Sequence, residues 1–354
     1  MIFINFFGIW NNVWPYLIAI AVFIALIIVH EFGHFIAAKI CGVKVNEFAV
    51  GFGPKLLKKK IGETVYAINL IPLGGYCAME GEDEESSDDR AFGKKGPFKR
   101  LFIVANGAIF NLILGFIIIG ISLLPGIGGD LIGTTTVAKF QENATSAQHG
   151  LMVGDKILSV DGRYVISDRD LFYTFTNVEN GELDLVVKRN GERVKLENVK
   201  FQTEKIEGVN TIKLDFWILG KKKTLPNLIE ATFRNTLSYG RIVWLSVVDL
   251  VSGKYGISEL SGPVGITATV GNVAKSNILN ILPIMALITI NLGIFNLFPL
   301  PALDGGRILF ILIELIFRKP IPQKYEGWVH TAGIIVLLGF MLLITIKDII
   351  ALFI

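Results

Sequence analysis

Four long runs of apolar residues are the first pattern along this chain of 354 residues. An α-helix rises about 1.5 Å per residue, so about 20 apolar residues cross the ~30 Å hydrocarbon core of a bilayer. The pattern therefore predicts a polytopic α-helical membrane protein with four transmembrane helices. The runs cover about Val13–Cys41, Leu101–Pro125, Ser276–Leu297 and Gly327–Ile346.

Residues 43–79, between the first two apolar runs, have a different pattern. Short β-prone runs alternate there with Gly and Pro, which is typical of strands separated by tight turns. The acidic run Glu80–Asp89 that follows is expected to be a solvated, flexible loop. We therefore predict a membrane-associated β-hairpin region of two or three strands, with turns at Gly51–Pro54, Ile61–Gly62 and Pro72–Gly75.

The long segment between the second and third apolar runs contains two further patterns. Residues 130–205 have short Val- and Ile-rich runs with Asp-Gly and Asn-Gly turns, which predicts a small folded domain. Residues 226–252 carry apolar residues at helical spacing, but the charges among them argue against a full span. Two interpretations of this amphipathic helix stay open: it lies at the membrane interface, or it packs on the small domain. Its apolar residues are Ile229, Phe233, Leu237, Trp244 and Val251.

The composition agrees with a membrane protein. Apolar residues make up 52% of the chain and charged residues 18%, and the mean hydropathy is +0.56. The net charge of +3 is too small to indicate a nucleic-acid partner. Two cysteines, Cys41 and Cys77, do not make a disulfide framework. The N-terminus lacks a positively charged region, so no cleavable signal peptide is expected.

Lys and Arg are unevenly distributed among the connections. Residues 43–100 contain ten and residues 304–326 contain four, whereas residues 1–12 contain none. Basic connections between spans stay on the cytoplasmic side of a membrane. We therefore expect both basic connections to be cytoplasmic and both termini to be outside. The long segment 126–275 is then extracytoplasmic.

The motif HEFGH, residues 30–34, places polar groups inside the first apolar run. A charged group at the centre of a bilayer costs about 2.5–3.5 kcal/mol on insertion scales, so such residues usually serve a function. His30 and His34 are four residues apart and share one helix face, where neutral imidazoles can bind one metal ion, preferably zinc. Glu31 can then act as a general base. The alternative, histidines that are merely satisfied in a core, is weaker for this motif in lipid.

Two histidines do not complete a catalytic zinc site, because three protein ligands are expected. The other histidines are His149, in the small domain, and His330, near the fourth run. Asp304 is the better candidate, because it follows the third run at the same expected membrane level as the motif. The alternative is that Asp304 is only a turn residue before Gly305.

The motif at 30–34 and the pattern Asn296-x-x-Pro299-x-Pro301-x-Leu303-Asp304-Gly305 together resemble the site-two-protease family of intramembrane zinc metalloproteases. Gly150–Gly162 resembles a PDZ core, and Leu260–Ile266 resembles the linker before the third span in this family. The chain is most similar to the bacterial branch of RseP and RasP, in a form with a single PDZ domain. One departure is Ala108, where the family usually has Pro.

The resemblance implies a site, a cofactor and a substrate class. His30, His34 and Asp304 would bind Zn2+, and Glu31 would be the general base. The substrates would be single-span membrane proteins, such as anti-sigma factors or remnant signal peptides, cut within or near their transmembrane helices. The protein would lie in a bacterial plasma membrane with its active site near the cytoplasmic side. The extracytoplasmic PDZ domain would bind a new C-terminus or filter substrates by size.

A helical substrate must unwind before its carbonyl groups can be attacked, which leaves backbone groups unpaired in lipid. An extended substrate could add to an edge of the predicted strands. Asn296 would hydrogen-bond its backbone, as its family counterpart is thought to do, and Pro299 and Pro301 would keep their own segment extended. The alternative is an ordinary cytoplasmic hairpin. Close approach would be allowed by Gly51, Gly53, Gly74 and Gly75.

Two other functions are less consistent with the sequence than a protease. A non-enzymatic adaptor would be expected to lose Glu31, and a zinc transporter would usually show inverted repeats, which the sequence lacks.

The expected domain organisation is a first transmembrane helix with HEFGH (1–42), the β-hairpin region and acidic loop (43–100), a second helix (101–125), the PDZ domain (126–205), a linker with the amphipathic helix (206–275), a third helix (276–298), the Leu-Asp-Gly motif with its connection (299–326) and a fourth helix (327–354).

Overall fold

The computed structural model describes residues 6–127, 129–176, 178, 180–206, 209–254, 256, 260–319 and 321–351. In this part of the chain, four helices are long and apolar enough to cross a membrane. They correspond to the four predicted spans, so the protein is a multi-pass membrane protein. The candidate spans are Val13–Ile40, Pro97–Ser122, Ile278–Asn296 and Lys324–Ile350.

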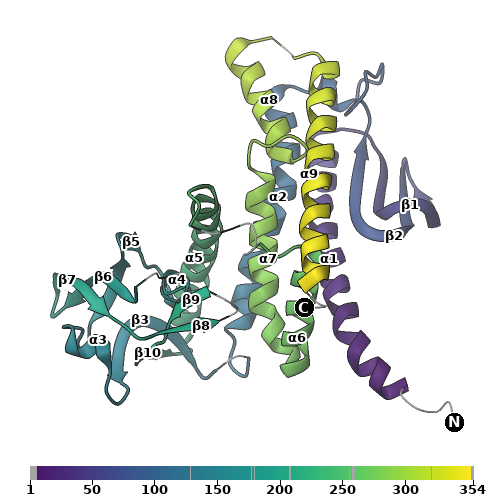
Figure 1. The fold of residues 1–354 in the computed structure, drawn as a ribbon. Helices are drawn as coiled ribbons and strands as arrows, with labels where there is room; N and C mark the ends of the chain where they lie inside the picture. Colours follow the sequence, from purple (N-terminus) through teal and green to yellow (C-terminus); the bar gives the residue numbers. More distant parts are fainter. Residues whose placement is uncertain are drawn as a thin grey trace. The chain divides into compact units, whose positions relative to one another are not determined.

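The chain divides into two units, residues 1–115 with 260–354 and residues 116–259. The first unit contains most of the long helices and one small sheet (Figure 1). Helix α2 passes from the first unit into the second. The elements of the first unit are α1 (Phe6–Ile40), β1 (Val45–Ile61), β2 (Thr64–Met79), η1 (Phe92–Lys94), α2 (Pro97–Ser122), α6 (Pro263–Ser276), η3 (Ile278–Asn280), α7 (Ile281–Asn296), α8 (Asp304–Phe317) and α9 (Gln323–Ala351).

Small residues allow the helices of the first unit to approach closely, as is usual in membrane helix packing. A Cβ atom on Gly33 of α1 would lie 2.3 Å from the carbonyl oxygen of Asn106 in α2. A Cβ atom on Gly293 of α7 would lie 3.0 Å from the carbonyl oxygen of Ala108, also in α2. Helix α2 is therefore packed between α1 and α7.

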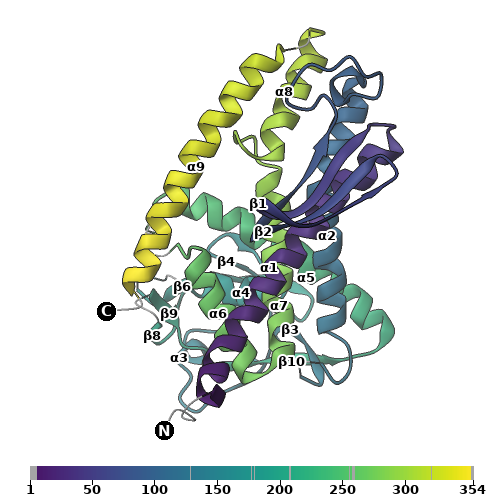
Figure 2. The ribbon, with the colours of Figure 1, turned by 90° about the vertical axis from the view of Figure 1, so that its right-hand side faces the viewer.

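Strands β1 and β2 form one antiparallel sheet in which each strand also folds back on itself. Phe48 lies opposite both Cys77 and Tyr66, and Val50 lies opposite both Gly75 and Ile68. The first part of β1 is therefore the middle of the sheet, with both ends of β2 on its two sides. Figure 2 shows this curled sheet beside α1. The prediction of a β-hairpin region is confirmed, with two long irregular strands.

The acidic run after β2 is held in place by hydrogen bonds. The Glu80 carboxylate accepts them from Lys44 (3.0 Å), Asn46 (3.0 Å) and Ser86 (2.6 Å). Asp88 accepts a hydrogen bond from the backbone N–H of Arg90 at 2.8 Å. The run has no helix or strand, as expected for a loop; these contacts hold Glu80 and Asp88, whereas residues 83–85 are exposed.

The second unit is built around a six-stranded sheet in the order β10-β3-β4-β6-β7, with β5 paired to β4. Its core is made largely of alternate strand residues and of the inner face of α4, such as Ile157, Leu185, Leu171 and Phe175. The elements are β3 (Leu131–Phe140), α3 (Thr145–Gln148), β4 (Lys156–Val160), β5 (Arg163–Tyr164), α4 (Asp168–Thr174), β6 (Glu182–Arg189), β7 (Glu192–Lys200), β8 (Thr203–Ile206), β9 (Val209–Ile212), β10 (Phe216–Lys222) and α5 (Leu225–Val251).

Helix α5 packs on β5 and α4 of the second unit through polar side chains. Arg163 pairs with Asp249 at 2.7 Å, Arg241 pairs with Asp170 at 3.1 Å, and Ser167 donates to Ser238 at 2.9 Å. The packing interpretation of this helix therefore has direct support. Its apolar stripe is nevertheless exposed, as an interfacial helix would also require; the stripe includes Ile229, Phe233, Leu237, Trp244 and Val251.

Candidate metal centre

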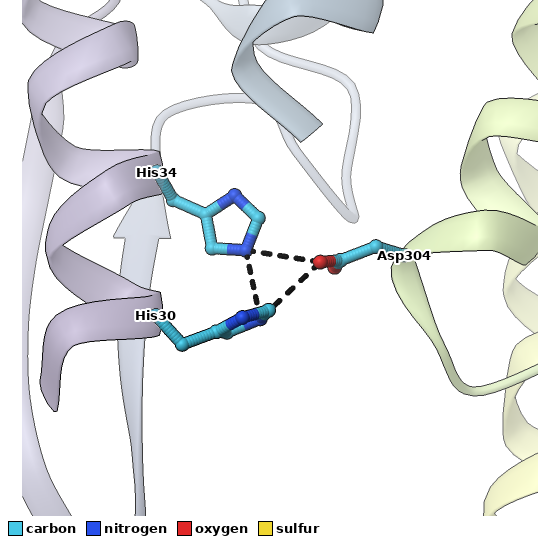
Figure 3. Close-up of side chains that lie close together, drawn as sticks. All are labelled: His30, His34 and Asp304. Atoms are coloured by element: carbon cyan, nitrogen blue, oxygen red, sulfur yellow. Dashed lines mark hydrogen bonds and ion pairs between the residues drawn. The ribbon is translucent and has the colours of Figure 1, made fainter. Parts of the chain in front are cut away.

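Three side chains from two helices converge at one point in the first unit (Figure 3). His30 and His34 lie one turn apart on α1, and Asp304 is the first residue of α8. The Nε2 atoms of the two histidines are 3.2 Å apart. Oδ2 of Asp304 lies 3.2 Å from Nε2 of His30 and 3.3 Å from Nε2 of His34. The prediction that Asp304 joins the two histidines therefore agrees with the geometry.

The turn between α7 and α8 aims Asp304 at the histidines. A Cβ atom on Gly305 would lie 2.0 Å from the Phe298 carbonyl oxygen, and one on Gly306 would lie 2.6 Å from the Leu300 carbonyl oxygen. Only glycines therefore fit where the first turn of α8 folds back on the preceding segment. The backbone N–H of Ala302, in this segment, donates to Nδ1 of His330 in α9 at 3.2 Å.

A hydrogen bond at Nδ1 of His34 fixes the tautomer of this ring. Nδ1 of His34 lies 3.0 Å from the backbone carbonyl oxygen of Ile103 in α2. A carbonyl oxygen can only accept a hydrogen bond, so Nδ1 carries the proton. The lone pair of Nε2 then points toward Asp304. Metal-binding histidines in proteins are commonly oriented in this way.

Asn111 of α2 has the corresponding position beside His30. Its Nδ2 atom lies 3.2 Å from Nδ1 of His30, and its buried Oδ1 atom has no hydrogen-bond partner among the described residues. The two ends of an amide are assigned from the hydrogen-bond network. With the amide turned by half a rotation, Nδ1–H of His30 donates to Oδ1, and Nε2 of His30 is left free to bind a metal.

The resulting set of atoms fits a zinc ion. Oδ2 of Asp304 is buried and, apart from the two imidazoles, has no polar partner among the described residues. Two imidazole nitrogens and one carboxylate oxygen are donors that zinc prefers in sites with three protein ligands. Gly107 of α2 leaves room for the rings, because a Cβ atom there would lie 2.2 Å from Nε2 of His34.

The electrostatics favour an ionised carboxylate at this centre. Burial by itself would raise the pKa of Asp304, but the adjacent His34 and His30 rings, when they carry a proton and a positive charge, lower this pKa well below its usual range. With both rings neutral, a bound cation would supply the positive charge that the buried carboxylate requires.

Glu31 lies outside the cluster but beside the sheet. It follows His30 on α1 and is half-buried. A Cβ atom on Gly75 of β2 would lie 3.4 Å from Cγ of Glu31 and 3.0 Å from the Ala49 carbonyl oxygen. Strand β2 therefore passes next to the Glu31 side chain, and a larger residue at position 75 would crowd it.

The other residues predicted to bind substrate lie at three places. Asn296 is buried at the end of α7, and Pro299 and Pro301 lie in the segment that leads to Asp304. Gly51, Gly53 and Gly74 lie where the strands fold back. A Cβ atom on Gly51 or Gly53 would meet Ile71, and a Cβ atom on Gly74 would lie 2.4 Å from the Phe52 ring. Among the four glycines, the structure brings Gly75 next to Glu31.

The sequence alone assigns no role to Asn111, Gly107 or the Ile103 carbonyl group. A polar residue in a span without charges is a signal that could have pointed to Asn111. Gly107 and Ile103 have no comparable signal, because their roles depend on how α2 packs against α1.

Comparisons with known proteins agree with this centre. The profile of Peptidase family M50 matches residues 18–340. A relative from Clostridium perfringens, named as a candidate zinc metalloprotease, is 36% identical over 334 residues, which are 94% of this chain and 97% of the relative. Zinc metalloprotease RasP of Bacillus licheniformis is 30% identical, and Regulator of sigma-W protease RasP of Bacillus subtilis is 29% identical. Both alignments cover 94% of this chain and 98% of the relative.

The family profile spans most of the chain, the relatives align over nearly their whole lengths, and the ligand set fits zinc. The chain therefore belongs to Peptidase family M50, the site-two proteases, and is an intramembrane zinc metalloprotease.

Proposed function

We propose that His30, His34 and Asp304 bind the catalytic zinc ion and that Glu31 is the general base. The observation that carries this assignment is the convergence of three ligand atoms within 3.3 Å of one another, from helices far apart in the sequence. Glu31 is adjacent to this convergence without belonging to it. Zinc held by these three residues would supply a Lewis acid for the scissile carbonyl group and for water.

Glu31 then moves the proton that peptide hydrolysis requires. Its carboxylate accepts a proton from the attacking water and returns it to the nitrogen of the leaving amine. The Ile103 carbonyl and the Asn111 amide hold the two imidazoles in the tautomer that leaves both Nε2 atoms free. These contacts keep the ligands fixed during the reaction.

The substrate is proposed to be the transmembrane segment of a single-span membrane protein, bound in extended form. Anti-sigma factors and remnant signal peptides are the two candidate groups, and the name of the Bacillus subtilis relative, Regulator of sigma-W protease, supports the former. The strand region around Gly75 would pair with the substrate backbone next to Glu31. Asn296 would hydrogen-bond the substrate backbone, and Pro299 and Pro301 would keep their segment extended.

Residues 126–205, in the second unit, are proposed to form an extracytoplasmic PDZ domain that selects substrates, with β10 added to its sheet through β3. Strand β10 is the last strand on one side of the six-stranded sheet. Asp168 of α4 and Ile218 of β10 both approach Gly133, so a helix lies near this outer strand. A peptide could add to the outer edge of β10 in the manner of PDZ ligands. The Lys and Arg distribution supports an active site near the cytoplasmic side of the membrane.

The test is cleavage of a tagged single-span substrate by the purified protein in detergent. Glu31→Gln should retain zinc and lose cleavage, because the amide preserves the shape of the side chain but cannot accept the proton. His34→Ala and Asp304→Ala should lose both, because each removes a ligand. Residual cleavage above a few per cent in Glu31→Gln would exclude its role as the base. Full zinc occupancy in Asp304→Ala would place the third ligand elsewhere.

A further inference from the structure

An ion pair lies one helical turn from Asp304. Arg307 is three residues after Asp304 on α8, about 4.5 Å further along the helix axis. Its Nη1 atom lies 2.7 Å from Oε1 of Glu82, and its Nη2 atom pairs with Asp83. Only 19% of the Arg307 side chain and 18% of the Glu82 side chain are exposed, whereas Asp83 is 78% exposed. Glu82 is therefore the partner least screened by water.

Glu82 is attached in turn to the end of β2. Its Oε2 atom accepts a hydrogen bond from the backbone N–H of Met79, the last residue of β2, at 3.3 Å. The same strand contains Gly75, which lies beside Glu31. One continuous set of contacts therefore links the strand next to Glu31 with the first turn of α8.

The loop that carries Glu82 is fixed on its other side as well. The backbone carbonyl oxygen of Glu80 accepts a hydrogen bond from Phe92 at 2.7 Å, and the Glu80 side chain pairs with Lys44. Glu82 is thus presented to Arg307 by a held loop. A rigid partner is needed for an ion pair to fix the position of α8.

We infer that the Arg307–Glu82 ion pair is a clamp that positions Asp304 against His30 and His34. The clamp holds α8 and the end of β2 together, so it keeps the third ligand and the strand beside Glu31 in one arrangement. Arg307 and Glu82 are positioning residues, because neither touches the ligand cluster. This inference rests on the proposed role of Asp304 as a zinc ligand.

A matched control exists on the same helix. Arg100 forms an ion pair with both carboxylate oxygens of Glu314, at 2.6 Å each, with similarly small exposed fractions of 14% and 16%. Glu314 is ten residues from Asp304, about 15 Å along the helix axis. Breaking this pair also removes an arginine–glutamate contact from α8, but at a distance from Asp304.

The experiment measures zinc affinity of the full-length protein in detergent by competition with a chromophoric chelator, together with Tm. Groups that orient metal ligands typically change metal affinity by about 10–100-fold when removed, and we expect a loss of this size for Arg307→Gln. Arg307→Lys keeps the charge but not the two-pronged geometry, so it should lose less. Arg100→Gln should lower Tm without weakening zinc binding.

The pairing itself is tested with Glu82→Gln and with the double variant Arg307→Gln/Glu82→Gln. If the two residues act as one clamp, the effects of the two substitutions should not add. The double variant should then bind zinc as tightly as the single variant with the lower zinc affinity. Glu82→Gln keeps its shape and can still accept a hydrogen bond, so it remains informative if Arg307→Gln fails to fold.

Two results would overturn the clamp. One is unchanged zinc affinity in Arg307→Gln and Glu82→Gln, and the other is an equal loss of affinity in Arg100→Gln. The Asp304→Ala variant distinguishes an error in the clamp proposal from an error in the proposed zinc ligands. If Asp304→Ala loses zinc while Arg307→Gln retains it, only the clamp is wrong. If Asp304→Ala retains zinc, the ligand assignment is wrong.

Discussion

His30 and His34 each have one ring nitrogen that faces the cluster and one that faces α2. The partners on α2 are a carbonyl group at Ile103 and an amide at Asn111. Both partners can accept a hydrogen bond from Nδ1–H, which keeps the ring proton on Nδ1 and leaves Nε2 able to bind a cation. The spacing of the two histidines was readable from the sequence because it depends only on helix periodicity. The partners were not, because they belong to another helix.

Asn111→Ala should weaken zinc binding by about 10–100-fold, because Nδ1 of His30 loses its partner. Asn106→Ala is the matched control. Asn106 is also a buried asparagine of α2, but its Nδ2 atom donates to the Phe102 carbonyl oxygen at 2.6 Å and not to a histidine. Chelator competition on both variants checks the prediction. Equal zinc affinity in the two variants would mean that the amide does not orient His30.

At the scale of elements, the sheet of β1 and β2 places an extended strand beside Glu31. The sequence predicted strands in this region, because Gly and Pro punctuate short β-prone runs. It did not predict that Phe48 and Val50 would each have partners on both sides. That register depends on where the chain folds back, and such long-range pairing has no local signal. The result is that Gly75, and not the other three glycines, lies next to Glu31.

An extended binding mode makes cleavage depend on how easily the substrate helix opens. In a helix, Gly costs about 1 kcal/mol and Pro about 3 kcal/mol relative to Ala. Each 1.36 kcal/mol corresponds to about a tenfold change in rate if opening precedes a slow chemical step. Replacing helix breakers in a substrate span by Leu should therefore slow cleavage several-fold.

Returning one Gly or Pro to the same span should restore the rate, and both effects should be smaller in Asn296→Ala, which holds the extended form less well. The measurement is the initial cleavage rate at equal substrate expression and insertion. Rates that do not respond to helix breakers would argue against local unwinding as a limiting step.

At the scale of the whole molecule, four spans and the distribution of Lys and Arg lead to one topology. Residues 43–100 and 304–326 would be cytoplasmic, and residues 126–275 would be outside. Cys41 lies just after the first span and is half-buried, whereas Cys77 is buried in β2. Burial, with a smaller effect of the Glu31 and Glu82 charges, raises the pKa of the Cys77 thiol. Its reactive thiolate is therefore scarce near neutral pH.

A membrane-impermeant thiol reagent tests this topology. A cysteine introduced as Glu142→Cys, at an exposed position of the second unit, should react in intact cells. Cys41 should react only after the cells are opened, and Cys77 should react slowly in both states. The double variant Cys41→Ser/Cys77→Ser contains no cysteine and shows how much of the labelling comes from other proteins. Labelling of Glu142→Cys only in opened cells would reverse the proposed orientation.

The sequence by itself determined the four spans, the pair of histidines and the glutamate between them, and it offered Asp304 as the candidate for the third ligand. Each follows from a local property: the length of an apolar run, the periodicity of a helix, or the position of a residue just after a span. The resemblance to the site-two proteases then supplied the roles of these residues.

Only the tertiary structure decided which groups support them. Asn111 faces His30, Arg307 pairs with Glu82, and Gly75 faces Glu31. Each of these contacts joins elements that are distant along the chain, and each depends on how helices and strands pack. A single sequence contains the residues that make such contacts but does not show which of them meet. Contacts between distant elements leave no repeating pattern along the chain.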